Sequence, residues 1–192
     1  MHANVADASP HGFGVTHRLP TKLMSRVPLS LSHVNSLSNE EFVRLVGPVF
    51  EHSPWIAESV ASSRPFASVA TLHSVMCDAV RQAGEERQLA LICAHPDLVG
   101  RTVLTAESKG EQAAAGLAGL ATEEITLFDR YNRAYKAQFG FPFVICARLN
   151  KKEAILKAFP VRLKNSRADE ITTALGEIFK IADLRLADLI TS

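Results

Sequence analysis

Three places in the sequence set polar side chains among apolar ones in a way that could support chemistry. The first is "LALICAHPDLVGR" (residues 89–101), where an apolar run is followed by His95 and Pro96. A proline excludes a helical backbone at the residue before it, so we expect a helix to end here and the imidazole to project from that end. A histidine donates or accepts protons near neutral pH. The alternative is a partly buried histidine without a catalytic role.

The second place is "ESKGEQ" (residues 107–112), in which Ser108, Glu111 and Gln112 are spaced for one face of a helix. A hydroxyl, a carboxylate and an amide on one face could recognise a ligand rich in N–H and C=O groups. The alternative is that Glu111 and Gln112 are solvated side chains in the first turns of a helix.

The third place is Arg185, in the predicted last helix. An apolar stripe with steps of three and four residues runs along this helix and reaches Arg185 one step later. The stripe consists of Ile171, Ala174, Ile178 and Ile181. A guanidinium on a buried stripe needs an anion or several acceptors, because an unpaired buried charge is costly. The alternative is an arginine that reaches water at the helix end. Together the three places predict a small pocket with a proton donor, a carboxylate and a fixed cation.

Helix start signals predict the elements that position these side chains. Ser38 and Glu41 have the spacing of a capping box. Thr105 and Ser166 can cap the helices that carry the second and third places, and Thr122 can cap another helix. The sequence lacks the two-residue alternation with turn signals that is typical of strands. These patterns predict an all-α fold.

The predicted architecture is a single domain of about eight helices with no sheet. One short segment near residues 139–147, "FGFPFVICA", is β-like but isolated, so we expect it to be extended and packed against helices. Residues 28–192 are predicted to be the helical domain. Residues 1–27 lack the apolar core of a secretory signal and are predicted to be a disordered extension. Whether Met24 is the true start stays open.

Composition limits the classes of partner. A chain that is 47% hydrophobic and 21% charged is typical of a soluble globular protein. The net charge of +1 comes with no basic stripe, which argues against a nucleic-acid partner. No apolar run reaches the roughly 18 residues of a membrane helix, so no membrane partner is predicted. The ending "DLITS" is not an S-K-L address, and a cytoplasmic location is the default.

The three cysteines, Cys77, Cys93 and Cys146, all lie in apolar contexts and are predicted to be reduced and buried. Cys93, His95 and Asp97 alternate, but no second cluster completes a tetrahedral set, so no metal site is predicted. A hydrolase with Cys93 or Cys146 as nucleophile is a competing hypothesis, and it predicts inactivation by thiol alkylation.

Five segments, taken in order, resemble the OHCU decarboxylase family, whose substrate is 2-oxo-4-hydroxy-4-carboxy-5-ureidoimidazoline (OHCU). They are "FEHSPWIAE" (residues 50–58), "HPDLVGR", "LTAESKGEQAAAGL", "FGFPFVICARLN" and the closing "EI…KIADLRL". Each is weak alone, but five with compatible spacing over residues 28–190 are specific. The resemblance implies an all-α carboxy-lyase of urate breakdown that forms (S)-allantoin and needs no metal or organic cofactor.

Carried over by motif, the resemblance implies that His95 is the catalytic proton donor. We expect Glu111 to be the second catalytic residue, which holds or polarises a substrate N–H or hydroxyl. The implied substrate-binding residues are Pro96, Ser108, Gln112, Phe143, Val144, Ile145, Cys146, Ala147 and Arg185. Residues 143–147 are expected to act largely through their backbone. Arg148 and Arg162 also lie in family-like contexts, so the choice of arginine stays open.

Three features of the protein do not follow from its sequence. The chain is shorter than many relatives between "HPDLVGR" and "LTAES", so the shape of the loop over residues 97–107 is not predicted. A non-catalytic helical module that binds a purine-derived ligand is the alternative function, although His95 and Glu111 are both present. A homodimer is neither predicted nor excluded, because no exposed apolar stripe indicates one.

Overall fold

The computed structural model describes residues 28–100 and 104–191. These residues form nine α-helices, three short 3-10 helices and one pair of two-residue strands, so the predicted all-α fold is confirmed. The extension predicted over residues 1–27 lies outside the described residues. Residues 101–103, which belong to the loop whose shape was not predicted, also lie outside them.

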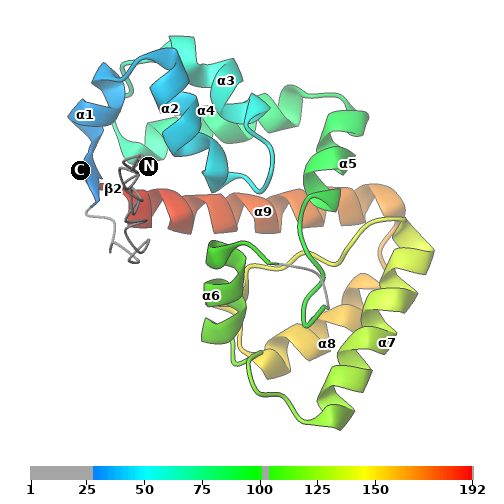
Figure 1. Ribbon diagram of the computed structural model, residues 1–192. Coiled ribbons are helices and arrows are strands. Elements are labelled where there is room, and N and C mark those ends of the chain that lie inside the picture. Colours follow the sequence, from blue (N-terminus) through cyan, green and yellow to red (C-terminus); the bar gives the residue numbers. More distant parts are fainter. Residues whose placement is uncertain (1–27, 101–103, 192) are drawn as a thin grey trace, which may run out of the picture.

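The helices form two groups on either side of the longest helix, α9 (Figure 1). The first group comprises α1 (Leu31–Ser36), α2 (Asn39–Val46), η1 (Gly47–Val49), α3 (Trp55–Val60), η2 (Ala61–Ser63), α4 (Val69–Gln82) and α5 (Glu85–Cys93). The second comprises α6 (Ala106–Ala114), α7 (Thr122–Phe139), η3 (Ala147–Leu149) and α8 (Lys152–Arg162).

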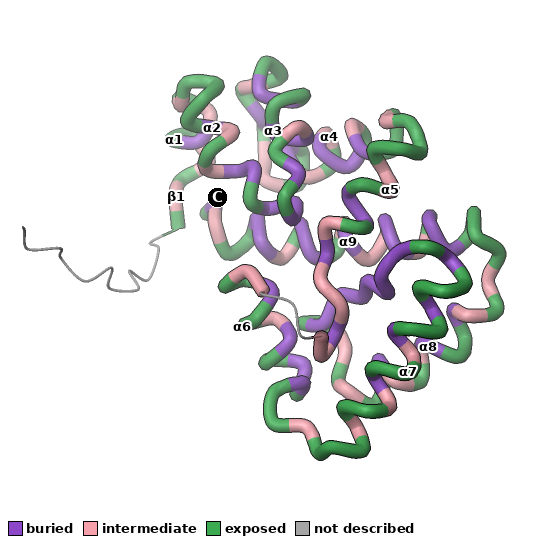
Figure 2. Tube along the Cα trace, turned by 45° about the vertical axis from the view of Figure 1, so that its right-hand side comes forward, coloured by how far each residue is buried: buried purple, intermediate pink, exposed green. Residues whose placement is uncertain are grey.

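Helix α9 (Arg167–Leu189) is the element that both groups share. It packs against α4 and α5, and buried residues follow it along its length (Figure 2). Its buried side chains include the predicted stripe of Ile171, Ala174, Ile178 and Ile181, and Arg185 lies beyond them on the same face. A charged side chain therefore reaches the interior where the two groups meet.

Both ends of the described domain are joined by a short strand pair. β1 (Leu29–Ser30) lies parallel to β2 (Ile190–Thr191). The prediction of no sheet misses this pair, because two-residue strands are too short to leave an alternating pattern in the sequence. No helix among the described residues is long and apolar enough to span a membrane.

The predicted caps are mostly confirmed. Ser38 and Glu41 form a reciprocal capping box at α2, and the side chains of Thr105 and Ser166 cap α6 and α9. The prediction for Thr122 is wrong, because α7 is preceded by Ala121 as its N-cap residue. The backbone N–H of Ala121 donates to the Glu124 carboxylate (3.0 Å), which satisfies this end without a hydroxyl cap.

The extended segment is confirmed between α7 and η3. Gly140 ends α7 with φ +82°, a left-handed conformation that glycine adopts without strain. Residues 142–146 then have no regular secondary structure. The segment is shorter than the predicted range 139–147, because Phe139 belongs to α7 and Ala147 belongs to η3. Phe143 anchors the segment by stacking on Phe159 of α8, with ring centroids 3.9 Å apart.

Candidate active site

His95 lies just beyond the end of α5, as the proline after it predicts. Only 7% of the residue is exposed, and its Nδ1 lies 2.9 Å from the carbonyl oxygen of Leu91. A carbonyl can only accept, so Nδ1 carries the proton in this contact. No hydrogen bond joins Nε2 to another described residue. In the neutral ring Nε2 then carries a lone pair, and His95 is one of the residues that line the cavity.

Burial keeps this imidazole neutral. Loss of water around the ring is the largest effect and lowers the pKa of His95 to about 4. The hydrogen bond to Leu91 and the charge of Glu51 raise the pKa, whereas the charges of Arg185 and His52 lower it. At neutral pH in the unliganded protein, His95 is therefore a proton acceptor before it is a donor.

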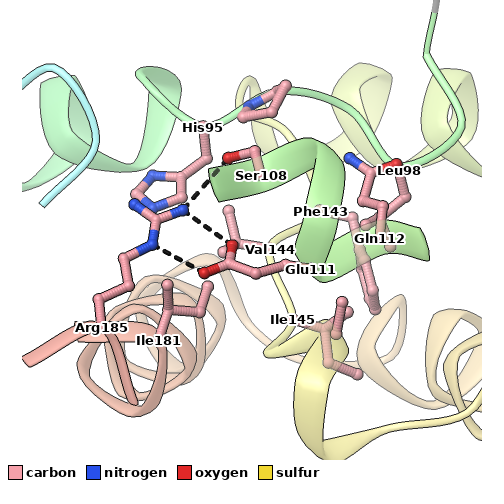
Figure 3. Close-up of a pocket in the computed structure, with 12 residues that line it drawn as sticks. His95, Leu98, Ser108, Glu111, Gln112, Phe143, Val144, Ile145, Ile181 and Arg185 are labelled. Atoms are coloured by element: carbon pink, nitrogen blue, oxygen red, sulfur yellow. Dashed lines mark hydrogen bonds and ion pairs between the residues drawn. The ribbon is translucent and has the colours of Figure 1, made fainter. Parts of the chain in front are cut away.

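Helix α6 carries the polar face that the spacing predicts. Ser108 and Gln112 are buried, and Glu111 lies between them with 13% of its side chain exposed. Helix α6 ends at Ala114. The helix is thus short, and its polar face lies beside α9 (Figure 3).

Gln112 also shapes the segment that follows His95. Its side-chain oxygen accepts from the backbone N–H of Val99 (3.1 Å). From the other side, the amide of Asn132 on α7 donates to the carbonyl of Leu98 (2.8 Å). Val99 has φ +56°, a conformation that a β-branched residue adopts only when its surroundings impose it. Gln112 therefore holds the wall of the cavity as well as lining it.

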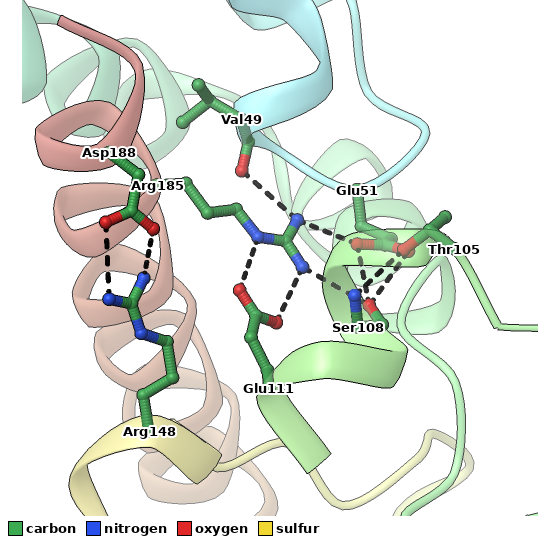
Figure 4. A network of polar contacts seen from close by, with 8 residues as sticks. All are labelled: Val49, Glu51, Thr105, Ser108, Glu111, Arg148, Arg185 and Asp188. Carbon is green, nitrogen blue, oxygen red and sulfur yellow. Dashed lines mark hydrogen bonds and ion pairs between the residues drawn. The ribbon is translucent and has the colours of Figure 1, made fainter. Parts of the chain in front are cut away.

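Arg185 is buried and every one of its donors is engaged. Its Nε and Nη2 donate to the two oxygens of Glu111, each at 2.8 Å, in the parallel arrangement that favours arginine over lysine. Nη1 donates to Glu51 (2.8 Å), and Nη2 also donates to Ser108 (3.2 Å). A longer contact joins Nη1 to the carbonyl of Val49 (3.5 Å). Figure 4 shows this network.

Glu51 is a member of the site that the sequence reasoning missed. It belongs to "FEHSPWIAE", but a single acid between η1 and α3 has no spacing that indicates a role. The structure buries it to 3% exposure beside Thr105, Ser108 and Arg185. Burial alone would raise the pKa of Glu51, but Arg185 and Thr105 hold it below its ordinary value. The carboxylate is therefore charged at neutral pH.

The extended segment forms the opposite wall. Phe143, Val144, Ile145 and Ala147 line the cavity. Cys146 does not, although it was predicted to bind substrate, because the segment turns its backbone N–H to Glu177 on α9 (2.8 Å). The remaining predicted site residues lie together around one cavity, which is lined by His95, Pro96, Leu98, Ser108, Glu111, Gln112, Phe143, Val144, Ile145, Ala147, Ile181 and Arg185.

The cavity is narrow. Its free volume is about 30 Å³, whereas pockets that hold drug-sized ligands measure roughly 300–1,000 Å³. A ligand of that size therefore requires the walls to move apart. Arg185 and Glu111 are clamped together, so we expect the wall that follows His95 to give way before they do.

The structure separates the three candidate arginines. Arg185 lines the cavity. Arg162 is also buried, but it pairs with Glu170 and donates to the carbonyl of Val144 (2.6 Å), behind the extended segment. Arg148 lies at the surface in an ion pair with Asp188.

The cysteines differ from their prediction in one respect. Cys77 and Cys146 are buried, but Cys93 is exposed, because α5 ends at this residue. Burial raises the pKa of the Cys146 thiol, which disfavours the nucleophilic thiolate. Among residues 28–100 and 104–191, no three His, Cys, Asp or Glu side chains gather in a way that could hold a metal ion.

Comparison with known proteins decides the family. The family model described as OHCU decarboxylase matches residues 35–187. The chain belongs to the OHCU decarboxylase family. The matched range contains Glu51 and every residue that lines the cavity of this family member, from His95 to Arg185.

Similar proteins from distant organisms carry the same description. The 2-oxo-4-hydroxy-4-carboxy-5-ureidoimidazoline decarboxylase of Haloferax volcanii is 45% identical over 164 residues, which cover 85% of this chain and 98% of the relative. The protein of that description from Amia calva is 45% identical over 169 residues, or 84% and 95% of the two chains. A solved structure of OHCU decarboxylase in the presence of (S)-allantoin superposes with a TM-score of 0.63 at 25% identity, covering 80% of this chain and 98% of that one.

Proposed function

We propose that this protein decarboxylates OHCU to (S)-allantoin in urate degradation, with His95 as the group that delivers the proton. The observation that carries the proposal is a buried histidine that lines the same cavity as a carboxylate paired with a clamped arginine. Membership of the decarboxylase family gives the reaction class, a carboxy-lyase.

The chemistry of the substrate explains why such a site is needed. OHCU carries a hydroxyl and a carboxylate on C4, and C5 bears the ureido group and a ring C=N bond. When the C4–carboxylate bond breaks, carbon dioxide leaves and the electron pair moves toward the C=N bond. The C4 hydroxyl then becomes a carbonyl, and C5 takes a proton. The enzyme must deliver this proton to one face of C5 to give a single enantiomer.

A neutral His95 suits both proton movements. Nε2 accepts the hydroxyl proton as the C4 carbonyl forms, and the same nitrogen then donates a proton to C5. The electron pair that carbon dioxide leaves behind ends on the nitrogen of the former C=N bond, and this nitrogen takes one proton from solvent. The bond from Nδ1 to the carbonyl of Leu91 keeps the ring in one tautomer and orientation throughout.

The remaining side chains hold the substrate. Glu111 still has lone pairs beyond those used by Arg185, so it accepts a substrate N–H or the hydroxyl. Gln112 and backbone groups of residues 143–145 and 147 bind the amide edges. All five N–H groups of Arg185 point at protein acceptors. If Arg185 contacts the substrate directly, its Nη1 gives up the 3.5 Å contact with the Val49 carbonyl before any shorter one.

The test is a coupled assay with His95→Asn. Urate, urate oxidase and the following hydrolase generate OHCU, and the rise in optical activity reports (S)-allantoin. Spontaneous decarboxylation protonates either face and gives no such signal. Because general acid–base catalysis contributes about 10²–10⁴-fold, we expect the initial rate to fall by about 10³-fold.

His33→Asn is the matched control, because this histidine is exposed on α1 and outside the cavity. It should retain the wild-type rate. A His95→Asn variant that forms (S)-allantoin as fast as wild type would contradict the role of His95. A wild-type protein without any effect on the rate would favour the alternative of a non-catalytic binding module.

The proposal extends to the setting of the protein. We infer that residues 28–192 act as one catalytic domain, without a metal or organic cofactor, in the cytoplasm. Nucleic acid and membrane are not expected partners. The oligomeric state, including a homodimer, is a separate question that sedimentation of the purified protein answers.

A further inference from the structure

We propose that Glu51 is a positioning residue of this active site, which fixes Arg185 and the start of α6 so that Glu111 and His95 face the substrate. Its kinetic consequences rest on the proposed function. The structural part of the inference can be measured without any turnover.

Glu51 reaches the site from a different part of the fold than its partners. It follows η1 in the first group of helices, whereas Ser108 comes from α6 and Arg185 from α9 (Figure 4). Ser108 is 57 positions from Glu51 in the chain, and Arg185 is 134 positions from it. One carboxylate therefore ties the first group to both elements that carry the polar side chains of the cavity.

The first contact fixes the start of α6. The Thr105 hydroxyl accepts from the backbone N–H of Ser108 (3.2 Å) as the helix cap, and it donates its proton to Glu51 (2.9 Å). A hydroxyl has one proton, so the acceptor that takes it decides the rotamer of the cap. Glu51 also places a negative charge near the positive end of the helix, which is favourable. Both effects hold the helix that carries Glu111.

The second contact sets the polarity of Ser108. Its hydroxyl oxygen lies 3.2 and 3.1 Å from the two Glu51 oxygens, and it accepts from Nη2 of Arg185 at 3.2 Å. The hydroxyl proton is therefore directed to Glu51. Ser108 then offers the substrate a lone pair rather than a proton, so it favours a substrate N–H over a carbonyl at that position.

The third contact concerns the direction of Arg185. Glu111 holds the Nε and Nη2 edge of the guanidinium, and Glu51 holds Nη1 at 2.8 Å. Two carboxylates on two edges fix the plane of the guanidinium. Without Glu51, Nη1 loses its short contact. The guanidinium is then held by Glu111 alone, and the two groups can rotate together. The carboxylate of Glu111 would turn with it, away from the substrate.

Several charges and dipoles meet around His95. Glu51 and His52 face it from the segment between η1 and α3, Arg185 from α9, and the Leu91 carbonyl from α5. Glu111 of α6 lines the same cavity. Glu51 is the negative charge that opposes Arg185 at the imidazole. Its removal therefore lowers the affinity of His95 for a proton.

The experiment compares Glu51→Gln with wild type and with Glu107→Gln. Glu107 is exposed in the first turn of α6, so its variant removes a charge near the same helix end without touching the network. For Glu51→Gln we expect kcat to fall by about 10- to 100-fold, because a small misplacement of reacting groups has effects of this size. KM should change less than kcat, because Glu111 and Ser108 are displaced but still present, and the larger loss falls on the geometry of the reacting groups. Glu107→Gln should behave as wild type.

A second measurement reports position directly. The Nε–H of Arg185 gives a nitrogen–proton NMR signal, which should be sharp and slow to exchange in wild type because the group is buried. In Glu51→Gln the signal should broaden or move, and in Glu107→Gln it should not. An unchanged signal together with wild-type kcat in Glu51→Gln would overturn the inference.

Glu51→Asp covers the case in which the Gln variant does not fold. It keeps the charge but shortens the side chain, so we expect kcat between those of wild type and a His95→Asn variant, with KM unchanged. A folded Asp variant with wild-type kcat would overturn the inference. If wild type itself does not convert OHCU, the proposed function fails, and the NMR comparison still decides the role of Glu51.

Discussion

Arg162 and Arg185 are equally buried, at 7% exposure each, but the groups around them differ in charge and in access. Arg162 donates to Glu170 (2.7 Å), to the carbonyl of Val144 (2.6 Å) and to the Tyr135 hydroxyl (3.3 Å). The fully buried Glu170 also accepts from Asn165 (2.7 Å). One arginine and one carboxylate thus form a neutral cluster whose groups satisfy one another.

The Arg185 cluster has a surplus of negative charge. Glu51 and Glu111 both pair with the one guanidinium, and a neutral His95 lies at the same cavity. The Arg162 cluster instead packs behind the cavity wall, with its guanidinium 4.3 Å from the Phe143 ring centre. A balanced cluster leaves no charge for a ligand, whereas the second carboxylate of the Arg185 cluster leaves acceptor capacity beside the cavity. The comparison therefore supports the proposal that Arg185, and not Arg162, is the arginine that serves the substrate.

The largest expected difference lies in the response to losing a carboxylate charge. Glu170→Gln leaves Arg162 buried without a counter-ion and should lower the free energy of unfolding by about 3–5 kcal/mol. Glu111→Gln leaves Arg185 paired with Glu51, so the loss should be below about 1 kcal/mol, while kcat/KM falls by about 100-fold. Urea unfolding and the coupled assay measure the two effects. Equal losses of stability would remove the distinction between the clusters.

The next effect is a pH dependence of stability that comes from His95, in the cavity, and not from the Arg162 cluster. Burial lowers the pKa of His95 from 6.5 to about 4, so the unfolded chain binds this proton more readily than the folded protein. The contribution of His95 to the free energy of unfolding is fully present above pH 6.5 and is lost as the pH falls toward 4. Between pH 7 and 5 the loss is about 2 kcal/mol.

Urea unfolding of His95→Asn at both pH values tests this expectation. The variant lacks the titrating group, so its stability should change less with pH than that of wild type. His33→Asn, at an exposed position, should follow wild type. Parallel pH dependence of wild type and His95→Asn would contradict a buried neutral imidazole.

The smallest effect belongs to the third arginine. Arg148 and Asp188 form an ion pair at the surface, with side chains 32% and 62% exposed. Exposed pairs contribute about 0–1 kcal/mol, so Arg148→Ala should change the free energy of unfolding by no more than this. The rate of (S)-allantoin formation should stay at the wild-type value. A large loss of activity would place Arg148 in the site and weaken the assignment of Arg185.

Local pattern was enough to predict much of the site. The proline after His95 forces the end of α5 by sterics within one peptide unit. The spacing of Ser108, Glu111 and Gln112 puts them on one helical face, and the stripe along α9 leads to Arg185 by helical periodicity. These predictions depend only on residues within a few turns of one another, and the five side chains lie around one cavity.

Tertiary structure decided what those side chains do. Glu51 enters the site from another group of helices, so no spacing in the sequence indicates it. Gln112 holds Val99, and Cys146 turns to Glu177, because chain segments that pack together offer nearer partners. The sequence by itself determined the helices and the residue types that meet. Only the packing of two groups on α9 decided which charges share a cavity and that His95 is neutral, because burial and pairing depend on distant segments.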